Sequence, residues 1–304
     1  MSRRRFVAVL AGLFLAAVAG AARGETLGIA AAADLRFALD EIVTAFRKDN
    51  PGDRIDVTYG SSGRFYAQIR QGAPFDLFFS ADIAYPRELH AAGMAASAVT
   101  PYGRGRLVVW SATLDAGRLD LRQLADPAIA RVAIANPRHA PYGRRAEEAL
   151  RRSGVWDKVE AKLIVAENVG QAAQFVLTGN AQAGIIALAL ALSPQLAGKG
   201  SYRTIPENLH EPLDQGFVIT RRAAANPLAR RFAAYLATPV AQAVLTRHGF
   251  VPPGADSQAV VSRSGPSAFR ASSRAPRAVP PSASSRCIRA RRGWRRRSAR
   301  GTGT

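Results

Sequence analysis

The sequence has very little cysteine and histidine, and it lacks the short motifs of common enzyme classes. Cys287 is the single cysteine among 304 residues, so no disulfide can form within one chain. The four histidines show no spacing typical of metal ligands, and there is no G-x-S-x-G, H-E-x-x-H or Walker sequence. A disulfide scaffold is excluded, and no enzyme class is favoured. We therefore expect no catalytic residue, no cofactor and no metal-cation site.

Acidic residues are scarce at both ends of the chain. Residues 1–24 contain four Arg and no acid, and residues 254–304 contain twelve Arg and one Asp. Of the formal net charge of +20, only +5 therefore belongs to residues 25–253. Because the positive charge is concentrated at the ends, the body of the chain gives no reason to expect a nucleic-acid partner.

The first 24 residues have the pattern of an export signal. Three consecutive Arg precede an apolar run, Phe6–Val18, which is too short for a membrane-spanning helix, and small residues follow. An uncleaved anchor is the alternative, and both general secretory and twin-arginine export fit the pattern. We expect a signal peptide at residues 1–24, cleaved after Ala19, Ala22 or Gly24, and a periplasmic protein.

Residues 254–304 differ in composition from the rest of the chain. They are rich in Ser, Ala, Pro and Arg, and no helical or strand periodicity persists. Such a segment buries too little apolar surface to repay the entropy cost of ordering. We predict a disordered Arg-rich tail, which a frame-shifted read-through would also explain. An arm that binds anionic lipid or nucleic acid is the functional alternative.

Residues 25–253 alternate between strand-like and helix-like segments. Short apolar runs such as Thr26–Ala30, Leu77–Phe79 and Val132–Ala135 predict buried strands, and apolar residues at helical spacing follow several of them. This alternation predicts an α/β fold with mainly parallel sheets. Open parallel sheets bind ligands beyond the carboxyl ends of their strands, so the strand-to-helix junctions are candidate sites.

Four of these junctions are rich in small or turn-forming residues. They are Ala32–Asp34, Gly60–Gly63, Ala140–Gly143 and Glu167–Gly170. Each would present backbone N–H groups at a helix N-terminus, where unpaired donors and the helix dipole favour an anion. A plain helix cap is the simpler explanation for any single junction. Four in one chain favour a shared anion site, although composition alone does not show that they converge.

The same junctions carry a resemblance to a known family. The segments A-A-A-D-L at 31–35, G-S-S-G at 60–63, G-A-P-F-D-L-F-F-S-A-D at 72–82, N-P with A-P-Y-G between 136 and 143, and E-N-V-G-Q-A at 167–172 resemble, in this order, the periplasmic molybdate-binding proteins. The resemblance extends over about Thr26–Pro253. It implies a type II periplasmic-binding-protein fold, in which two α/β lobes joined by a two-strand hinge close on the ligand.

In such a fold, lobe one would contain residues 25–105 plus 215–253, and lobe two residues 106–214. The resemblance implies a monomer that binds molybdate or the equally sized tungstate and delivers it to the permease and ATPase of an ABC importer. A binder of another oxyanion, such as sulfate, is the first alternative. A periplasmic serine hydrolase using Ser62, His139 and Asp82 is an alternative from a different class, although no motif supports it.

Carried over position by position, the resemblance places the oxyanion against Ala33, Asp34, Ser62, Tyr142 and Val169. A deprotonated tetrahedral oxyanion only accepts hydrogen bonds. Neutral N–H and O–H donors at helix N-termini can therefore hold it without a paired cation. The ligand itself contains the metal, and the same residues would bind it.

Asp34 departs from the family, in which Ser, Thr or Asn often occupies this position. A carboxylate about 4 Å from an anion costs about 4 kcal/mol per unit charge at an effective dielectric of about 20. Capping its own helix, pairing with Arg36 or Arg64, or binding a proton would each avoid this cost. Capping is the interpretation that the sequence favours, because Asp is a common N-cap. Some members also have a Tyr where this chain has Ala187, so we expect that contact to be missing.

Overall fold

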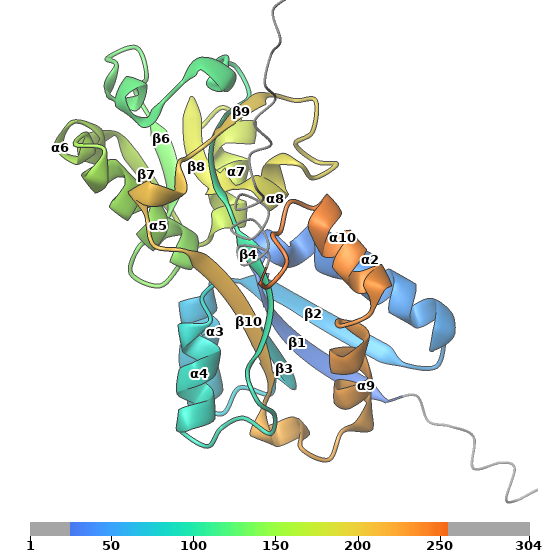
Figure 1. Ribbon diagram of the computed structural model, residues 1–304. Helices are drawn as coiled ribbons and strands as arrows, with labels where there is room; N and C mark the ends of the chain where they lie inside the picture. Colours follow the sequence, from blue (N-terminus) through green and yellow to red (C-terminus); the bar gives the residue numbers. More distant parts are fainter. Residues whose placement is uncertain (1–24, 255–304) are drawn as a thin grey trace, which may run out of the picture. The chain divides into compact units, whose positions relative to one another are not determined.

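The computed structural model describes residues 25–254, which form two five-stranded sheets with helices packed on them (Figure 1). The predicted signal peptide, the predicted tail beyond Gly254 and Cys287 lie outside the described residues. Within the described range, no helix has both the length and the apolar character needed to cross a membrane.

The first sheet has the strand order β2-β1-β3-β10-β4. Its strands are β1 (Thr26–Ala32), β2 (Arg54–Gly60), β3 (Leu77–Ser80), β4 (Thr100–Gly105) and β10 (Leu213–Ile219). Strand β1 is parallel to β2 and β3, whereas β10 is antiparallel to β3 and β4. The helices of this first lobe are η1 (Ala33–Leu35), α2 (Arg36–Asp49), α3 (Ser62–Arg70), α4 (Ala84–Ala91), η6 (Arg221–Ala223), α9 (Pro227–Tyr235) and α10 (Pro239–Arg247).

The second sheet has the strand order β7-β6-β8-β5-β9. Its strands are β5 (Leu107–Ser111), β6 (Val132–Ala135), β7 (Leu163–Ala166), β8 (Ala183–Ala187) and β9 (Ser201–Thr204). Strand β6 is parallel to β7 and β8, whereas β5 is antiparallel to β8 and β9. The helices of this second lobe are η2 (Ala116–Arg118), η3 (Leu121–Ala125), α5 (Pro141–Arg152), α6 (Trp156–Val159), η4 (Glu160–Lys162), α7 (Val169–Leu177), α8 (Leu188–Ala191) and η5 (Glu207–Leu209).

The prediction of two α/β lobes is confirmed, but the prediction of mainly parallel sheets is wrong. In each sheet, two of the four neighbouring strand pairs are antiparallel. The cause is the double connection between the lobes. Arg106 alone separates β4 from β5, and the chain returns between β9 and β10, so the strands by which the chain enters each sheet from the other lobe, β5 and β10, run against the βαβ strands. Edge strands β4 and β9 carry few large apolar residues and therefore gave little signal in the sequence.

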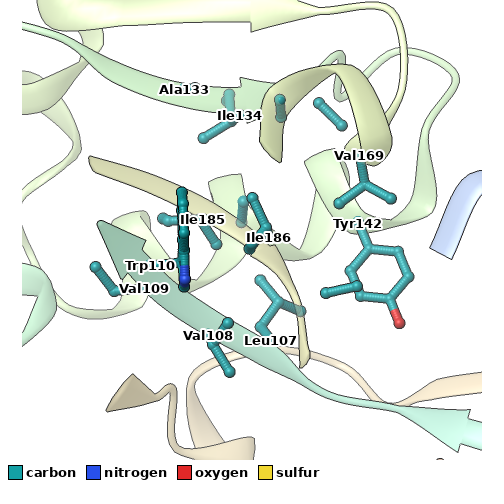
Figure 2. Packing of buried hydrophobic residues seen from close by; sticks show 14 of the residues in the cluster. Leu107, Val108, Val109, Trp110, Ala133, Ile134, Tyr142, Val169, Ile185 and Ile186 are labelled. Atoms are coloured by element: carbon teal, nitrogen blue, oxygen red, sulfur yellow. The ribbon is translucent and has the colours of Figure 1, made fainter. Parts of the chain in front are cut away.

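The core of the second lobe extends to the side that faces the first lobe (Figure 2). Trp110 of β5 is fully buried and packs in one cluster with Ile134 of β6 and Ile186 of β8. Tyr142 and Val169, two of the predicted site residues, belong to the same cluster. Their positions are therefore fixed by the packing of the lobe rather than by a free loop.

Candidate oxyanion-binding site

A small cavity lies where the four predicted junctions meet. The space open to the centre of a water molecule is about 10 Å³, within about 190 Å³ of unfilled space that includes open solvent. The lining residues are Ala32–Asp34 at the end of β1 and in η1, Gly60–Ser62 from the end of β2 to the start of α3, Ala140–Tyr142 before and within α5, Asn168–Val169 at the start of α7, and Ala81 after β3. Two junctions come from each lobe. The convergence that composition could not show is therefore a property of the fold.

All five predicted site residues, Ala33, Asp34, Ser62, Tyr142 and Val169, line this cavity and are buried. Their contact with a ligand stays a prediction. Among the other lining residues, Ala81 follows a fully buried strand, where the sequence pattern indicated only a helix cap. Ala187 is buried at the end of β8 and is not among the residues that line the cavity.

Ser62 is oriented by a hydrogen bond within its own lobe. Its Oγ accepts the backbone N–H of Ala81 at 3.0 Å, and the residue is only 1% exposed. This bond uses an oxygen lone pair and leaves the hydroxyl hydrogen for an acceptor in the cavity. Helix α3 begins at Ser62 without a side-chain cap, and the N–H of Gly63 in its first turn donates to the carbonyl oxygen of His139.

The two second-lobe helices at the cavity begin differently. Helix α5 starts at Pro141 with no side-chain cap. Helix α7 starts at Val169, where Asn168 Oδ1 accepts the N–H of Gln171 at 3.0 Å. That cap satisfies the N–H of Gln171, the third residue of the helix, and leaves the N–H of Val169 for other partners. Both N-termini are suited to an anion through backbone donors and the helix dipole.

Asp34 does not cap a helix, so the interpretation favoured by its sequence is wrong. Neither η1 nor α2 has a side-chain cap. The chain enters η1 directly from the buried strand β1, and Asp34 stays inside the lobe at 1% exposure. The ion-pair interpretation is also wrong, since Arg64 pairs with Glu167 at 2.5 Å and the guanidinium of Arg36 lies over an aromatic ring.

Asp34 instead belongs to a buried polar network. Gln215 Nε2 donates to Asp34 Oδ2 at 2.8 Å and to the hydroxyl oxygen of Tyr142 at 3.2 Å, while the hydroxyl of Tyr102 donates to Gln215 Oε1 at 2.6 Å. Asp34 Oδ1 has no hydrogen-bond partner among the described residues. Burial raises the pKa of Asp34 to about 6, because desolvation outweighs the hydrogen bond from Gln215. This acid is therefore easier to protonate than an ordinary Asp.

Gln215 and Tyr102 were not predicted as part of the site. Both are fully or almost fully buried, and they lie on β10 and β4, next to the crossings between the lobes. The available signal was Gln215, a polar residue at the start of the apolar run that continues through Phe217 to Ile219. A buried polar side chain needs a partner, and here that partner is the acid in the cavity.

The lobes contact each other beside the cavity. The backbone N–H of Gly63 donates to the carbonyl oxygen of His139 at 2.9 Å, and Ser61 Oγ donates to the same oxygen at 2.5 Å. A Cβ added at Gly63 would lie 2.6 Å from that oxygen, so only glycine permits this approach. The Arg64–Glu167 ion pair adds a further link. The structure is thus closed around the cavity.

The proposed triad of Ser62, His139 and Asp82 is not formed. The serine that meets His139 is Ser61, whose Oγ lies 2.9 Å from Nδ1. Asp82 lies beside Arg144 instead, at 3.4 Å. Among the described residues there is also no group of three or more His, Cys, Asp or Glu side chains placed to hold a metal ion. The geometry gives the hydrolase alternative no support.

Comparison with known proteins identifies the family. The sequence matches the bacterial extracellular solute-binding proteins over residues 27–251. The chain belongs to this family. Its relatives include the molybdate-binding protein ModA of Azotobacter vinelandii, 36% identical over 251 residues, which are 81% of this chain and 96% of the relative. ModA of Rhodobacter capsulatus is 35% identical over 235 residues, which are 76% of this chain and 90% of the relative.

Solved structures agree with this assignment. The periplasmic molybdate-binding protein of Azotobacter vinelandii superimposes with a TM-score of 0.71 at 34% identity, covering 75% of this chain and 99% of that chain. The resemblance to periplasmic molybdate-binding proteins and the type II periplasmic-binding-protein fold are confirmed. The sulfate-binding protein SubI of Mycobacterium tuberculosis, with a TM-score of 0.62 at 18% identity over 80% of this chain and 92% of that chain, shares the fold.

Proposed function

We propose that this solute-binding protein captures molybdate, or the equally sized tungstate, and delivers it to the permease and ATPase of an ABC importer. The observation that carries the proposal is the convergence of four junctions, two from each lobe, on one small pocket between the lobes. The chain's similarity to molybdate-binding relatives over most of their length supports the choice of ligand. Binding rather than catalysis is the proposed activity, because the relatives are solute-binding proteins.

The chemistry of the lining fits an oxyanion. Apart from Asp34, every lining residue is neutral, and the cavity is closed by helix N-termini and hydroxyl groups. Donors of this kind are strongest in a site that excludes water. We propose that the anion contacts Ala33, Asp34, Ser62, Tyr142 and Val169. Discrimination would come from size, because a smaller anion such as sulfate leaves some donors without an acceptor.

The cellular setting follows from the same assignment. The family consists of extracellular proteins, and the first 24 residues have the pattern of an export signal. We propose export to the periplasm, a monomeric protein and no cofactor other than the transported anion. The importer, with its permease and ATPase, would be the partner that recognises the closed form.

Isothermal titration of the mature protein with molybdate, tungstate, sulfate and phosphate tests the proposal. We expect one site per chain, similar affinities for molybdate and tungstate, and sulfate affinity lower by about tenfold or more. Sulfate binding as tight as molybdate binding would assign the protein to a different oxyanion. Turnover of generic ester substrates, abolished by Ser61→Ala, would instead favour a hydrolase.

A further inference from the structure

Asp34 is the one acid in the cavity, and the proposed function does not explain it. The network fixes which of its oxygens is occupied. Since the hydroxyl of Tyr102 donates to Gln215 Oε1 at 2.6 Å, the Nε2 group of Gln215 must face the other way, toward Asp34 and Tyr142. Asp34 Oδ2 is therefore an acceptor at 2.8 Å, and a proton on this side chain would lie on Oδ1.

Oδ1 is also the oxygen left for a ligand. It is buried without a hydrogen-bond partner in the described part of the chain, and its residue lines the cavity. A buried polar atom without a partner costs free energy unless a ligand or water satisfies it. An ionised Oδ1 can only accept hydrogen bonds, and the oxyanion also only accepts them. The two negatively charged groups would therefore repel each other. A protonated Oδ1 can donate to the oxyanion.

Among residues 25–254, no cation faces Asp34 to offset such repulsion. The titratable groups that face it are the hydroxyls of Tyr102 on β4 and Tyr142 on α5, and burial raises the pKa of both well above the ordinary range. The charged residues nearest in sequence to these network residues pair elsewhere: Arg104 of β4 with Asp214 of β10, Arg144 of α5 with Asp82, and Arg145 of α5 with Glu148. Strands β1 and β3 and helices α7 and α8 contain no charged residue. Arg36 of α2 lies over a tyrosine ring, and Arg64 of α3 is held in an ion pair with a glutamate.

We infer that Asp34 holds the oxyanion as a neutral carboxylic acid, donating a hydrogen bond from Oδ1, so that binding of the dianion takes up one proton. The inference rests on the proposed function. The proton comes from the solvent and ends on Oδ1, and no bond of the anion breaks. In the free protein the pKa of Asp34 is raised to about 6, so most of the acid is ionised at neutral pH and must be protonated on binding.

Asparagine provides a test because it copies the protonated acid at every pH. Its side-chain oxygen can accept from Gln215 as Oδ2 does now, and its amide nitrogen can donate into the cavity as the protonated Oδ1 would. Asp34→Asn should therefore bind without taking up a proton. Asp82→Asn is the matched control, since it removes one negative charge from the same lobe at a residue that does not line the cavity.

The experiment is calorimetric titration of molybdate into the mature protein between about pH 6 and about pH 9. Wild-type affinity should fall by up to about tenfold per pH unit above the pKa of Asp34, and the affinity of Asp34→Asn should change less than about twofold. Asp82→Asn should keep the wild-type slope. At one pH, the binding enthalpy of wild type should change between buffers by the difference in their ionisation enthalpies for one proton. The binding enthalpy of Asp34→Asn should be the same in every buffer.

These measurements distinguish a wrong role for Asp34 from a wrong ligand for the protein. A wild-type affinity that is flat with pH overturns the inference and leaves the proposed function standing. The inference is also overturned if Asp34→Asn melts as a folded protein yet binds far more weakly at every pH. The amide donor would then fail to replace the protonated carboxyl. If folded wild type binds neither molybdate nor tungstate at any pH, the proposed function itself is wrong, and the inference falls with it.

Discussion

The two lobes share one sheet plan but bring different chemistry to the cavity. Each sheet has two parallel strand pairs beside two antiparallel ones. The first lobe contributes polar side chains, the carboxyl of Asp34 and the hydroxyl of Ser62. The second lobe contributes the starts of α5 and α7, where Tyr142 and Val169 are part of its apolar core. Ligand chemistry is therefore set by the junction residues and not by the sheets.

This difference assigns separate tasks to the lobes. We propose that the first lobe controls charge and hydrogen-bond direction at the ligand, through Asp34 and its partner Gln215 on β10. The second lobe supplies backbone donors held rigidly by packing, so side-chain changes there should act on closure more than on charge. Substitutions in each of the two lobes test whether the lobes have these separate tasks.

The largest expected effect is on stability, at Asp34. Its pKa is raised from an ordinary 3.8 to about 6, so between these values the folded state binds more protons than the unfolded state. Wild-type stability should therefore fall as pH rises through this window, by roughly 3 kcal/mol in total. Asp34→Asn should be more stable than wild type by up to this amount near neutral pH, and the gain should vanish below about pH 4.

Urea unfolding of the ligand-free protein measures this difference. Asp56→Asn is the control, since Asp56 lies on β2 with its side chain 55% exposed and outside the cavity, and its effect should stay within about 0.5 kcal/mol. An Asp34→Asn protein that is less stable than wild type at neutral pH would show that the ionised carboxyl is stabilised by contacts beyond those described.

The next effect is on closure, at Gly63. A Cβ there would lie 2.6 Å from the carbonyl oxygen of His139 in the other lobe. Gly63→Ala should hold the lobes apart and weaken molybdate binding by roughly 2–3 kcal/mol, the upper part of the range for overpacking. The same Cβ would lie 2.8 Å from the hydroxyl oxygen of Tyr85 on α4 of the first lobe, so the melting temperature of the free protein should fall as well, by about 2–4 °C for each kcal/mol of strain.

Gly52→Ala is the matched control, because a Cβ there meets nothing within 4 Å. It should leave molybdate affinity unchanged. Small-angle scattering should show a smaller ligand-induced compaction for Gly63→Ala than for wild type. Wild-type affinity in Gly63→Ala would mean that binding does not need this close approach.

A smaller effect is expected from the hydroxyl of Ser62. Ser62→Ala should weaken molybdate binding by about 1.5–2 kcal/mol, the lower part of the range for a hydrogen bond to a charged group. Stability should also fall, by about 1 kcal/mol, because the buried N–H of Ala81 loses its acceptor. Ser111→Ala is the control, a buried second-lobe serine whose Oγ bonds only to backbone groups, so it should lower stability and leave affinity unchanged.

The sequence predicted the parts of this site that depend on local pattern. Strand β6 is found where the apolar run Val132–Ala135 predicted it, and helix α7 begins within the junction Glu167–Gly170, which was recognised, like the other three, by its small or turn-forming residues. Local pattern also explains the misses. Strand β4 reads T-P-Y-G-R-G, which has no apolar alternation, and it exists because β10 pairs with it.

The role of Asp34 was not predictable for a related reason. Its partner Gln215 lies 181 positions away in the sequence, so no local window contains both. A cap is a local interaction and was therefore the interpretation that the sequence favoured. What the sequence did provide was the anomaly itself, an acid at a position where an anion is expected, and the fold supplied its explanation.

The smallest expected effect is from the ion pair between Arg64 of the first lobe and Glu167 of the second, at 2.5 Å. The Arg64 side chain is 59% exposed and that of Glu167 33%, so water and salt screen the pair. A double-mutant cycle with Arg64→Ala and Glu167→Ala should give a coupling of about 0.3–1 kcal/mol in molybdate binding, and added salt should reduce it.

The pair spans the lobes, so it should slow ligand release rather than speed capture. Stopped-flow measurement would show this as a faster dissociation rate in each single variant, with the association rate nearly unchanged. A coupling that persists at high salt would mean that the pair is shielded from solvent in the closed form, and that closure depends on charge as well as on the close backbone approach at Gly63.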